Sequence, residues 1–337
     1  MTKYYRPIVQ SDVVRPLNAL PLADGWCWFD QVEIQERAGS SEIVPANELP
    51  TDVLGNLTNP RTPVAGLELD GPRLMGILNS TPDSFSDGGQ FNSVETGVSH
   101  ALQMIKNGAD IIDIGGESTR PGARLVTPEQ EVSRTIPVIE AIRANSPIPI
   151  SIDTRKASVA GAAIAAGATI VNDVSAFSFD AQLADLVAKS EVPICLMHAQ
   201  GDPATMQKDP IYDNVLLDVY DYLAERITIA TAAGIARRNI IIDPGIGFGK
   251  TVEHNLTLIR NIALFHSLGC PILLGASRKR FIGTLSGTTD ASERMPGSIA
   301  VALAGISQGV QITRVHDIAE TRQAVTLWSA LTGMRQK

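Results

Sequence analysis

The chain has 337 residues, 44% of them hydrophobic and 19% charged, which is enough for one large globular domain and a small accessory one. Its 28 Lys and Arg residues stand against 36 Asp and Glu residues, and the formal net charge of −8 argues against nonspecific binding to nucleic acid or to acidic membranes. Three scattered cysteines without a C-x-x-C pair predict buried, reduced thiols, and no signal-peptide core or membrane-spanning run is visible, so we expect a cytoplasmic protein.

Residues 1–72 show no regular alternation of strands and helices. Gly25–Arg37 could form strands and Ala46–Leu57 a short helix, which together predict a small N-terminal extension or subdomain of unknown role. We expect its aromatic residues to lie in a core and not to bind a ligand. These aromatic residues are Trp26, Trp28 and Phe29.

From residue 73 onward, short apolar runs alternate with helix-like segments. The runs are continuously apolar, which is typical of strands buried on both faces of a parallel sheet. The predicted strands cover residues 73–79, 110–115, 149–154, 169–174, 193–198, 240–245, 271–277 and 311–317. The predicted helices include residues 94–107, 129–145, 156–166, 215–233 and 318–331.

Eight strands, each followed by a helix, in about 265 residues predict a (β/α)8 TIM barrel over residues 73–337. A doubly wound parallel sheet is the alternative architecture. Polar residues lie at or just beyond the carboxyl end of nearly every predicted strand, which is the end where barrel enzymes place their active sites. Helix capping explains one or two of these residues but not the whole set, which comprises Asn79, Asp113, Asp153, Asn172, Met197, His198, Asp243, Ser277, Lys279, Arg314 and His316.

Two basic clusters follow the last two predicted strands. Residues 277–280 read Ser-Arg-Lys-Arg, and Arg314 and His316 end the eighth strand. Loops at these places in barrels often hold phosphate, and the small residues at 275–277 would allow backbone N–H groups to approach an anion. Arg314 lies within an apolar run, so we expect it to have an anionic partner. For Arg280, a solvated surface charge is the alternative.

A second cluster combines carboxylates with an amide. Asp153, Asn172 and Asp243 follow separate strands, and Lys279 lies nearby in the predicted barrel. A 2-amino-4-oxopyrimidine edge, as in pterin or guanine, offers adjacent N–H donors that one carboxylate can accept together. The rim therefore combines residues suited to a heterocycle with residues suited to an anion.

Other site chemistries fit the sequence less well. No two of the five histidines have a zinc-ligand spacing, whereas Mg²⁺ held mainly by substrate phosphates needs only one or two protein oxygens. No G-x-S-x-G motif for a serine nucleophile is present. The run at 245–250, GIGFGK, lacks the spacing of a phosphate-binding P-loop, and we expect a tight loop at the rim.

Eight segments, in order along the chain, resemble those of dihydropteroate synthases, the folate-pathway enzymes that join a pterin diphosphate to p-aminobenzoate. They include ILNSTPDSFSDGG at 77–89, DIGGESTRPGA at 113–123, IDPGIGFGK at 242–250 and GASRKRFIG at 275–283. The other four lie at 150–156, 171–177, 195–201 and 313–321, and residues 1–72 lie outside the resemblance. Ser80 and Ala199 depart from the family pattern, in which a β-branched residue and often Met stand there.

The resemblance implies a role for each matching residue. The pterin-binding residues would be Asp153, Asn172, Met197, Asp243, Phe248, Gly275 and Lys279. The diphosphate-binding residues would be Asn79, Arg314 and His316, with Asn79 also bound to magnesium. The p-aminobenzoate-binding residues would be Phe85, Thr119, Arg120, Pro121 and Ser277. The catalytic residues would be Asp153, Asp243, Lys279, Arg314 and His316.

The implied reaction is displacement of diphosphate from the C9 methylene of the pterin by the arylamine, in a magnesium-dependent, sulfonamide-sensitive homodimer. Such a reaction needs stabilisation of the leaving group more than a strong base. Two other functions remain open at this point. A pterin-dependent methyltransferase would share the heterocycle-binding residues but need no diphosphate site, and a paralogue could bind pterin without catalysis.

Overall fold

A computed structural model describes residues 2–80, 90–117, 125–201 and 210–333. Its main sheet has eight parallel strands in the order β11-β10-β9-β8-β7-β6-β13-β12, and a parallel bridge between Ile242 and Ile272 joins the two outermost strands. The sheet is therefore closed, which confirms the barrel and excludes the doubly wound alternative. The strands are β6 (Arg73–Asn79), β7 (Ile111–Gly115), β8 (Ile150–Asp153), β9 (Ile170–Asp173), β10 (Ile194–Met197), β11 (Ile240–Asp243), β12 (Leu273–Leu274) and β13 (Ile312–Val315).

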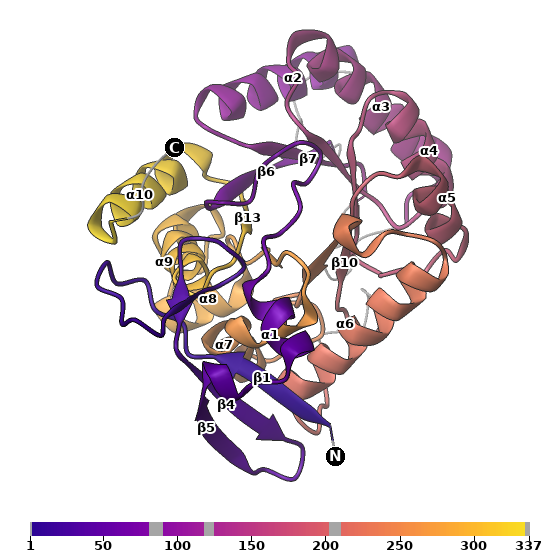
Figure 1. Cartoon of the computed structure of the whole chain (residues 1–337). Helices are drawn as coiled ribbons and strands as arrows, with labels where there is room; N and C mark the ends of the chain where they lie inside the picture. Colours follow the sequence, from indigo (N-terminus) through magenta and orange to yellow (C-terminus); the bar gives the residue numbers. More distant parts are fainter. Residues whose placement is uncertain (1, 81–89, 118–124, 202–209, 334–337) are drawn as a thin grey trace.

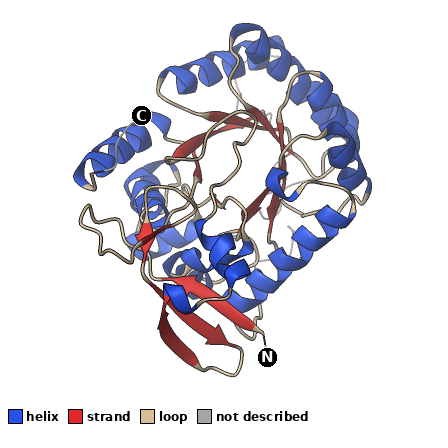
Figure 2. Cartoon of the chain, in the orientation of Figure 1, coloured by secondary structure: helices blue, strands red, loops and turns tan. Residues whose placement is uncertain are grey.

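Helices surround the strands as an outer ring (Figures 1 and 2). The five helical segments predicted from sequence are confirmed, with boundaries that differ by a few residues at most. The helices are α2 (Gln90–Lys106), α3 (Pro128–Asn145), α4 (Ala157–Ala165), α5 (Gln182–Ser190), α6 (Val215–Ala232), α7 (Val252–Arg260), α8 (Arg280–Ser286), α9 (Met295–Ile306) and α10 (Ile318–Leu331).

Capping residues fix where two of the rim loops end. The Thr127 hydroxyl accepts a hydrogen bond from the Gln130 backbone N–H, and the Gln130 side chain accepts one from the Thr127 N–H. Thr251 and His254 form the same reciprocal arrangement at the start of α7. Each pair satisfies backbone donors that a helix start leaves unpaired, so the loops after β7 and β11 end at defined residues.

The N-terminal extension contains the strands and the helix expected from its sequence. A three-stranded antiparallel sheet is formed by β1 (Lys3–Pro7), β4 (Gln31–Glu36) and β5 (Ser41–Pro45), and it lies beside the barrel near the N-terminus in Figure 1. The other elements are β2 (Leu20–Pro21), β3 (Trp28–Phe29), the 3-10 helix η1 (Ala46–Glu48) and α1 (Thr51–Thr58). The three aromatic residues expected in a core, Trp26, Trp28 and Phe29, are buried.

Polar contacts attach the extension to two barrel helices. The Trp26 indole N–H donates to the Ile306 carbonyl at the end of α9, over 2.9 Å. On the other side, the Tyr4 hydroxyl and the Arg37 guanidinium both bind Asp221 of α6, at 2.9 and 2.6 Å. The extension therefore packs against helices that are far apart in the sequence.

A short turn from residues 64–67 closes the end of the barrel at which the strands begin. Val64 and Leu67 exchange two backbone hydrogen bonds of 3.0 and 2.9 Å, and φ is +49° at Ala65 and +81° at Gly66, as in a type I′ turn. Val64 and Leu69 are buried in one cluster with residues at or near the start of seven strands. These strand residues are Met75, Ile111, Ile170, Cys195, Ile241, Leu273 and Ile312. The apolar floor leaves the opposite end for polar side chains.

Two further expectations from composition can be compared with the structure. Cys27, Cys195 and Cys270 are buried free thiols, as predicted. Among the helices that the structure describes, none has both the length and the apolar character needed to cross a membrane.

The floor yields the first prediction. Leu69→Ala removes a buried side chain that packs inside the barrel, and we expect the free energy of unfolding to fall by about 2–5 kcal/mol. Glu68→Ala, at the neighbouring exposed position, should change it by less than about 0.5 kcal/mol. Urea unfolding of both variants measures the difference. Equal stability of the two variants would show that the floor is not part of the barrel core.

Candidate active site

The centre of the candidate site is an arginine between two carboxylates. Arg314, from β13, places Nε 2.6 Å from Asp113 Oδ2 and Nη2 2.9 Å from Asp153 Oδ2. The Asp113 side chain is fully buried, and that of Asp153 is 12% exposed. The expectation that Arg314 has an anionic partner is therefore met, and its partners belong to the protein.

Asn172 extends this cluster along β9. Its side-chain nitrogen lies 3.3 and 3.5 Å from the two oxygens of Asp113, and its backbone is paired with that of Asp153 on the adjacent strand. The side chain is almost completely buried. Four strands thus bring an amide, two carboxylates and one guanidinium together inside the rim.

Asp243 ends β11 and organises the glycine-rich loop that follows. Its Oδ1 accepts a hydrogen bond of 2.7 Å from the Gly245 N–H, and its backbone carbonyl accepts one of 3.0 Å from the His198 N–H. A Cβ on Gly245 would lie 1.8 Å from the His198 carbonyl oxygen, and φ is +69° there, so only glycine fits. The loop is the tight turn expected from the sequence.

Lys279 lies over this loop. Its ammonium donates to the Ile246 carbonyl and lies 4.5 Å from the centre of the Phe248 ring, a cation–π contact. A Cβ on Gly247 would lie only 2.9 Å from Lys279 Cδ, so the lysine chain packs directly on the glycine. Burial lowers the pKa of Lys279 to about 8, and the attraction of Asp243 only partly offsets this effect.

Ser277 and His316 come from the last two strands. Ser277 Oγ accepts a hydrogen bond of 3.2 Å from the His316 backbone N–H and lies 3.0 Å from Nδ1 of the same residue. The neighbouring Arg278 is bound in bidentate fashion to Asp317, with Nε 3.0 Å from Oδ2. Arg280 is exposed, which agrees with the alternative that it is a solvated surface charge. Of the three basic residues at 278–280, Lys279 therefore lies in the candidate site, Arg278 forms a structural ion pair with Asp317, and Arg280 lies on the surface.

Burial controls the electrostatics of the acidic residues. Burial raises the pKa of Asp153, and Arg314 opposes that increase while Asp113 adds to it. Burial also raises the pKa of Asp243, against the attraction of Lys279. For Arg314 burial acts in the opposite direction, but Asp113 and Asp153 outweigh it and raise the pKa. Arg314 is thus a fixed positive charge.

Sequence reasoning placed His198 at the end of a strand but gave no role to Lys250, which pairs with it beneath this loop. Lys250 Nζ lies 2.8 Å from His198 Nδ1 and donates to the Phe248 carbonyl at 3.0 Å. Both side chains are buried. Burial, reinforced by Lys250, lowers the pKa of His198 to about 2, so the imidazole is neutral at physiological pH. The signal in the sequence was a lysine immediately after a glycine-rich turn, which is a costly position unless its ammonium finds acceptors.

Whether the site could bind magnesium depends on which side-chain oxygens are free to act as ligands. Within residues 2–80, 90–117, 125–201 and 210–333, no group of three or more His, Cys, Asp or Glu side chains is placed to hold a metal ion. Asn79 is partly buried at the end of β6, while Asp113 and Asp153 are engaged by Arg314. One amide oxygen suits an ion bound mainly by substrate phosphates.

The remaining pterin-binding candidates lie along the same rim. Met197 is buried at the end of β10, paired in register with Asp243. Gly275 follows β12, and a Cβ there would lie 3.5 Å from Asp243 Oδ2. Four candidates for binding p-aminobenzoate lie outside the described residues, namely Phe85, Thr119, Arg120 and Pro121.

The comparisons with known proteins agree with this geometry. The family of pterin binding enzymes matches residues 75–316, from within β6 to the residue that follows β13. The chain is 46% identical over 270 residues to the dihydropteroate synthase of Escherichia coli K12, which covers 80% of this chain and 95% of that protein. The chain belongs to the dihydropteroate synthases. These enzymes are transferases of folate biosynthesis.

Two solved structures of this family extend the likeness to three dimensions. The dihydropteroate synthase of Xanthomonas albilineans with 4-aminobenzoic acid matches with a TM-score of 0.76 and 46% identity, over 80% of this chain and 97% of that one. The same enzyme in complex with 7,8-dihydropteroate matches with a TM-score of 0.73 and 44% identity, over 80% and 97% of the two chains. The family match begins after the N-terminal extension.

The pKa of Lys279 gives a prediction about stability and pH. The pKa of Lys279 is about 8 in the folded protein and near 10.5 in the unfolded chain. Between these two pH values, Lys279 is therefore protonated more often in the unfolded state than in the folded state. Stability contributed by this residue should therefore rise as the pH increases from about 8 to about 10.5. We expect the unfolding free energy of the wild type, minus that of Lys279→Met, to increase over this range. A constant difference from pH 7 to pH 10 would mean that the lysine keeps its ordinary pKa.

Proposed function

We propose that the rim of this barrel joins a pterin diphosphate to p-aminobenzoate, forming dihydropteroate and diphosphate, with the residue roles given below. The observation that carries the proposal is the buried cluster of Asp153, Asn172 and Asp243 beside two cations, Lys279 and Arg314. Support also comes from the Xanthomonas albilineans relatives, which hold 4-aminobenzoic acid in one structure and 7,8-dihydropteroate in another.

The pterin ring would bind between β8, β9 and β11. Its amino-pyrimidine edge presents two adjacent N–H donors, which suit the carboxylate of Asp243. Oδ1 of this carboxylate is already held by the Gly245 N–H, and the missing side chain at Gly275 leaves space in front of Oδ2. Lys279 would donate to a ring heteroatom, while Met197 and Phe248 line the slot.

The diphosphate would bind where β13 and β6 end. Arg314 and His316 supply positive charge or hydrogen bonds toward the leaving group, and preorganised groups of this kind stabilise developing charge at little reorganisation cost. Asn79 would hold magnesium together with the diphosphate oxygens. When bound, the ion would neutralise part of the charge that develops as the C–O bond breaks.

The nucleophile needs little activation from the protein. A neutral arylamine attacks through its own lone pair, so no general base is required for the displacement. Ser277, held by His316, would lie beside p-aminobenzoate. The contributions of Phe85 and of residues 119–121 remain predictions from the family resemblance. Sulfonamide sensitivity and a homodimer are also predictions from the family resemblance, whereas a cytoplasmic location is predicted from the cysteines and from the lack of a signal-peptide core or membrane-spanning run in the sequence.

Diphosphate release provides the direct test of this function. With magnesium present, purified protein should release diphosphate only when both pterin diphosphate and p-aminobenzoate are supplied, and dihydropteroate should appear in equal amount. A protein that binds pterin but releases no diphosphate would instead be a non-catalytic paralogue. Methyl transfer without diphosphate release would indicate the methyltransferase alternative.

Gly275→Ala tests the pterin site without removing a polar group. The new methyl group would make an ordinary contact of 3.5 Å with Asp243 Oδ2, so the protein should fold normally, but the methyl would occupy the space in front of that oxygen. We expect the affinity for a pterin to fall about ten- to hundredfold, the range for loss of a charged hydrogen bond. Calorimetry with a pterin measures the change.

A matched substitution provides the control. A Cβ on Gly161, in α4, would also make only ordinary contacts, at 3.7 Å from two carbons of Leu186. Gly161→Ala should therefore leave pterin affinity unchanged. If Gly275→Ala also binds pterin as well as the wild type does, the pterin does not approach Asp243 from this side.

A further inference from the structure

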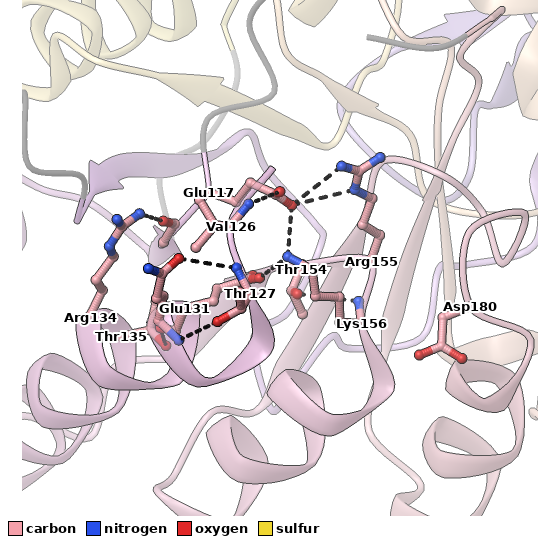
Figure 3. Close-up of polar contacts among 12 residues, drawn as sticks. Glu117, Val126, Thr127, Glu131, Arg134, Thr135, Thr154, Arg155, Lys156 and Asp180 are labelled. Carbon is pink, nitrogen blue, oxygen red and sulfur yellow. Dashed lines mark hydrogen bonds and ion pairs between the residues drawn. The ribbon is translucent and has the colours of Figure 1, made fainter. Parts of the chain in front are cut away.

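Two lysines at the rim are buried, but they are held in different ways. Lys156 Nζ lies 3.0 Å from Glu117 Oε2 and 2.6 Å from Glu131 Oε2, so two carboxylates compensate its charge (Figure 3). Lys250, which is 4% exposed, instead has three neutral acceptors. Within the described parts of the chain, an ion pair therefore accounts for the burial of Lys156 but not for that of Lys250.

The acceptors of Lys250 belong to two neighbouring loops. Its Nζ lies 2.8 Å from His198 Nδ1 and 3.5 Å from the carbonyl oxygen of the same residue, which follows β10. Nζ also donates to the Phe248 carbonyl over 3.0 Å, in the loop after β11. The two shorter contacts need only two N–H donors, so both the ammonium and the neutral amine can make them. One side chain thus holds the end of β10 to the glycine-rich loop.

His198 is fixed on its other sides as well. Its backbone N–H donates to the Asp243 carbonyl over 3.0 Å, and its ring packs edge-on against Tyr222 of α6, with 4.8 Å between the ring centres. The imidazole is neutral because burial, reinforced by Lys250, lowers its pKa to about 2. With Lys250 as the donor, Nδ1 accepts and the proton lies on Nε2. Lys250 therefore sets both the tautomer and the orientation of the ring.

The glycine-rich loop lies directly on the segment that follows β10. A Cβ on Gly249 would lie 2.5 Å from the Gln200 carbonyl oxygen, just as one on Gly245 would meet the His198 carbonyl oxygen. The Gly249 carbonyl also accepts a hydrogen bond of 2.8 Å from the Tyr212 hydroxyl. Because the two backbones are in contact, a displacement of one segment would move the other.

The contacts of Lys250 lie beside both apolar walls of the proposed pterin slot. His198 follows Met197 directly, and the other contact is with the backbone of Phe248 itself. A methionine in place of Lys250 would fill much the same space without burying a polar group. It would not set the distance between the two walls, since directional hydrogen bonds are needed to hold a ring and a carbonyl in place.

We propose that Lys250 is a positioning residue, which fixes the width of the pterin slot through His198 and the Phe248 carbonyl. These contacts set the spacing between Met197 and Phe248, the two apolar walls of the slot. The inference rests on the proposed function, which places the pterin between these walls. Lys250 acts through its two partners and needs no contact with the pterin.

Calorimetry of Lys250→Met with two ligands tests this role. We expect the Kd for a pterin to rise about tenfold, as for the loss of one hydrogen-bonded contact that holds the slot. The Kd for diphosphate, measured with magnesium, should change less than about threefold. Its proposed ligands lie at the ends of β13 and β6, which are not neighbours of β10 or β11 in the sheet.

His198 provides a second test, which remains available if loss of Lys250 prevents folding. His198→Asn can present an acceptor oxygen to Lys250 near the position of Nδ1, whereas His198→Leu, of similar size, cannot. Both variants lose the ring contact with Tyr222, so a difference between them reports on the contact with Lys250. We expect His198→Leu to bind a pterin about tenfold more weakly than His198→Asn does.

Arg61→Met is the matched control for loss of a buried cation. Arg61 is 8% exposed and, like Lys250, donates to backbone carbonyls, at 2.8 Å for Asn56 and 3.1 Å for His266. It lies three residues before the turn at 64–67 that closes the opposite end of the barrel. Its replacement should therefore leave pterin affinity unchanged.

Three results would overturn the inference. Lys250→Met could bind a pterin as tightly as the wild type does, it could lose affinity for the pterin and for diphosphate equally, or the two His198 variants could bind alike. An equal loss of pterin affinity in Arg61→Met would overturn it too, because the effect would then be general. A wild type that binds no pterin or releases no diphosphate would instead contradict the proposed function, so the two failures can be told apart.

Discussion

The guanidinium of Arg314 lies between the carboxylates of Asp113 and Asp153, at 2.6 and 2.9 Å, and the polar end of the barrel depends on this contact. Each of these charges would be costly to bury alone, and removing one partner leaves the others uncompensated. The contact also spans the barrel interior, from β13 to β7 and β8. Packing of the rim and its charge balance are therefore set by the same three side chains.

This contact joins the side of the site assigned to the diphosphate to the side assigned to the pterin. Arg314 was expected to serve the diphosphate and Asp153 the pterin, yet the two residues are bound to one another. A ligand that forms hydrogen bonds with one of them changes the electrostatic environment of the other. Occupation of the pterin side and of the diphosphate side should therefore be coupled through a direct contact.

Much of the barrel could be predicted from sequence, because continuously apolar runs such as residues 240–243 identify buried parallel strands without knowledge of their partners. The count of eight strands predicted a closed barrel but left a doubly wound sheet as the alternative, and the Ile242–Ile272 bridge, which depends on the register of the whole sheet, decides between them. In the site, Asp153 and Asp243 were found because they end strands. The pairing of Arg314 with Asp113 and Asp153 was not predicted, although both carboxylates were expected at strand ends, because β13 is not adjacent to β7 or β8 in the sheet. The floor at residues 64–67 was also missed, since a four-residue turn has no periodicity to detect.

The hydrogen bond between Trp26 and Ile306 has a consequence for synthesis of the chain. Its two residues are 280 positions apart, so the indole has no acceptor until nearly the whole barrel has left the ribosome. At typical elongation rates of about 5–20 residues per second, this interval is roughly 14–56 s. During that time the apolar residues of the extension, including Trp26, lack the surface that buries them. The extension emerges before the barrel, yet it is among the last parts of the chain to reach its final packing.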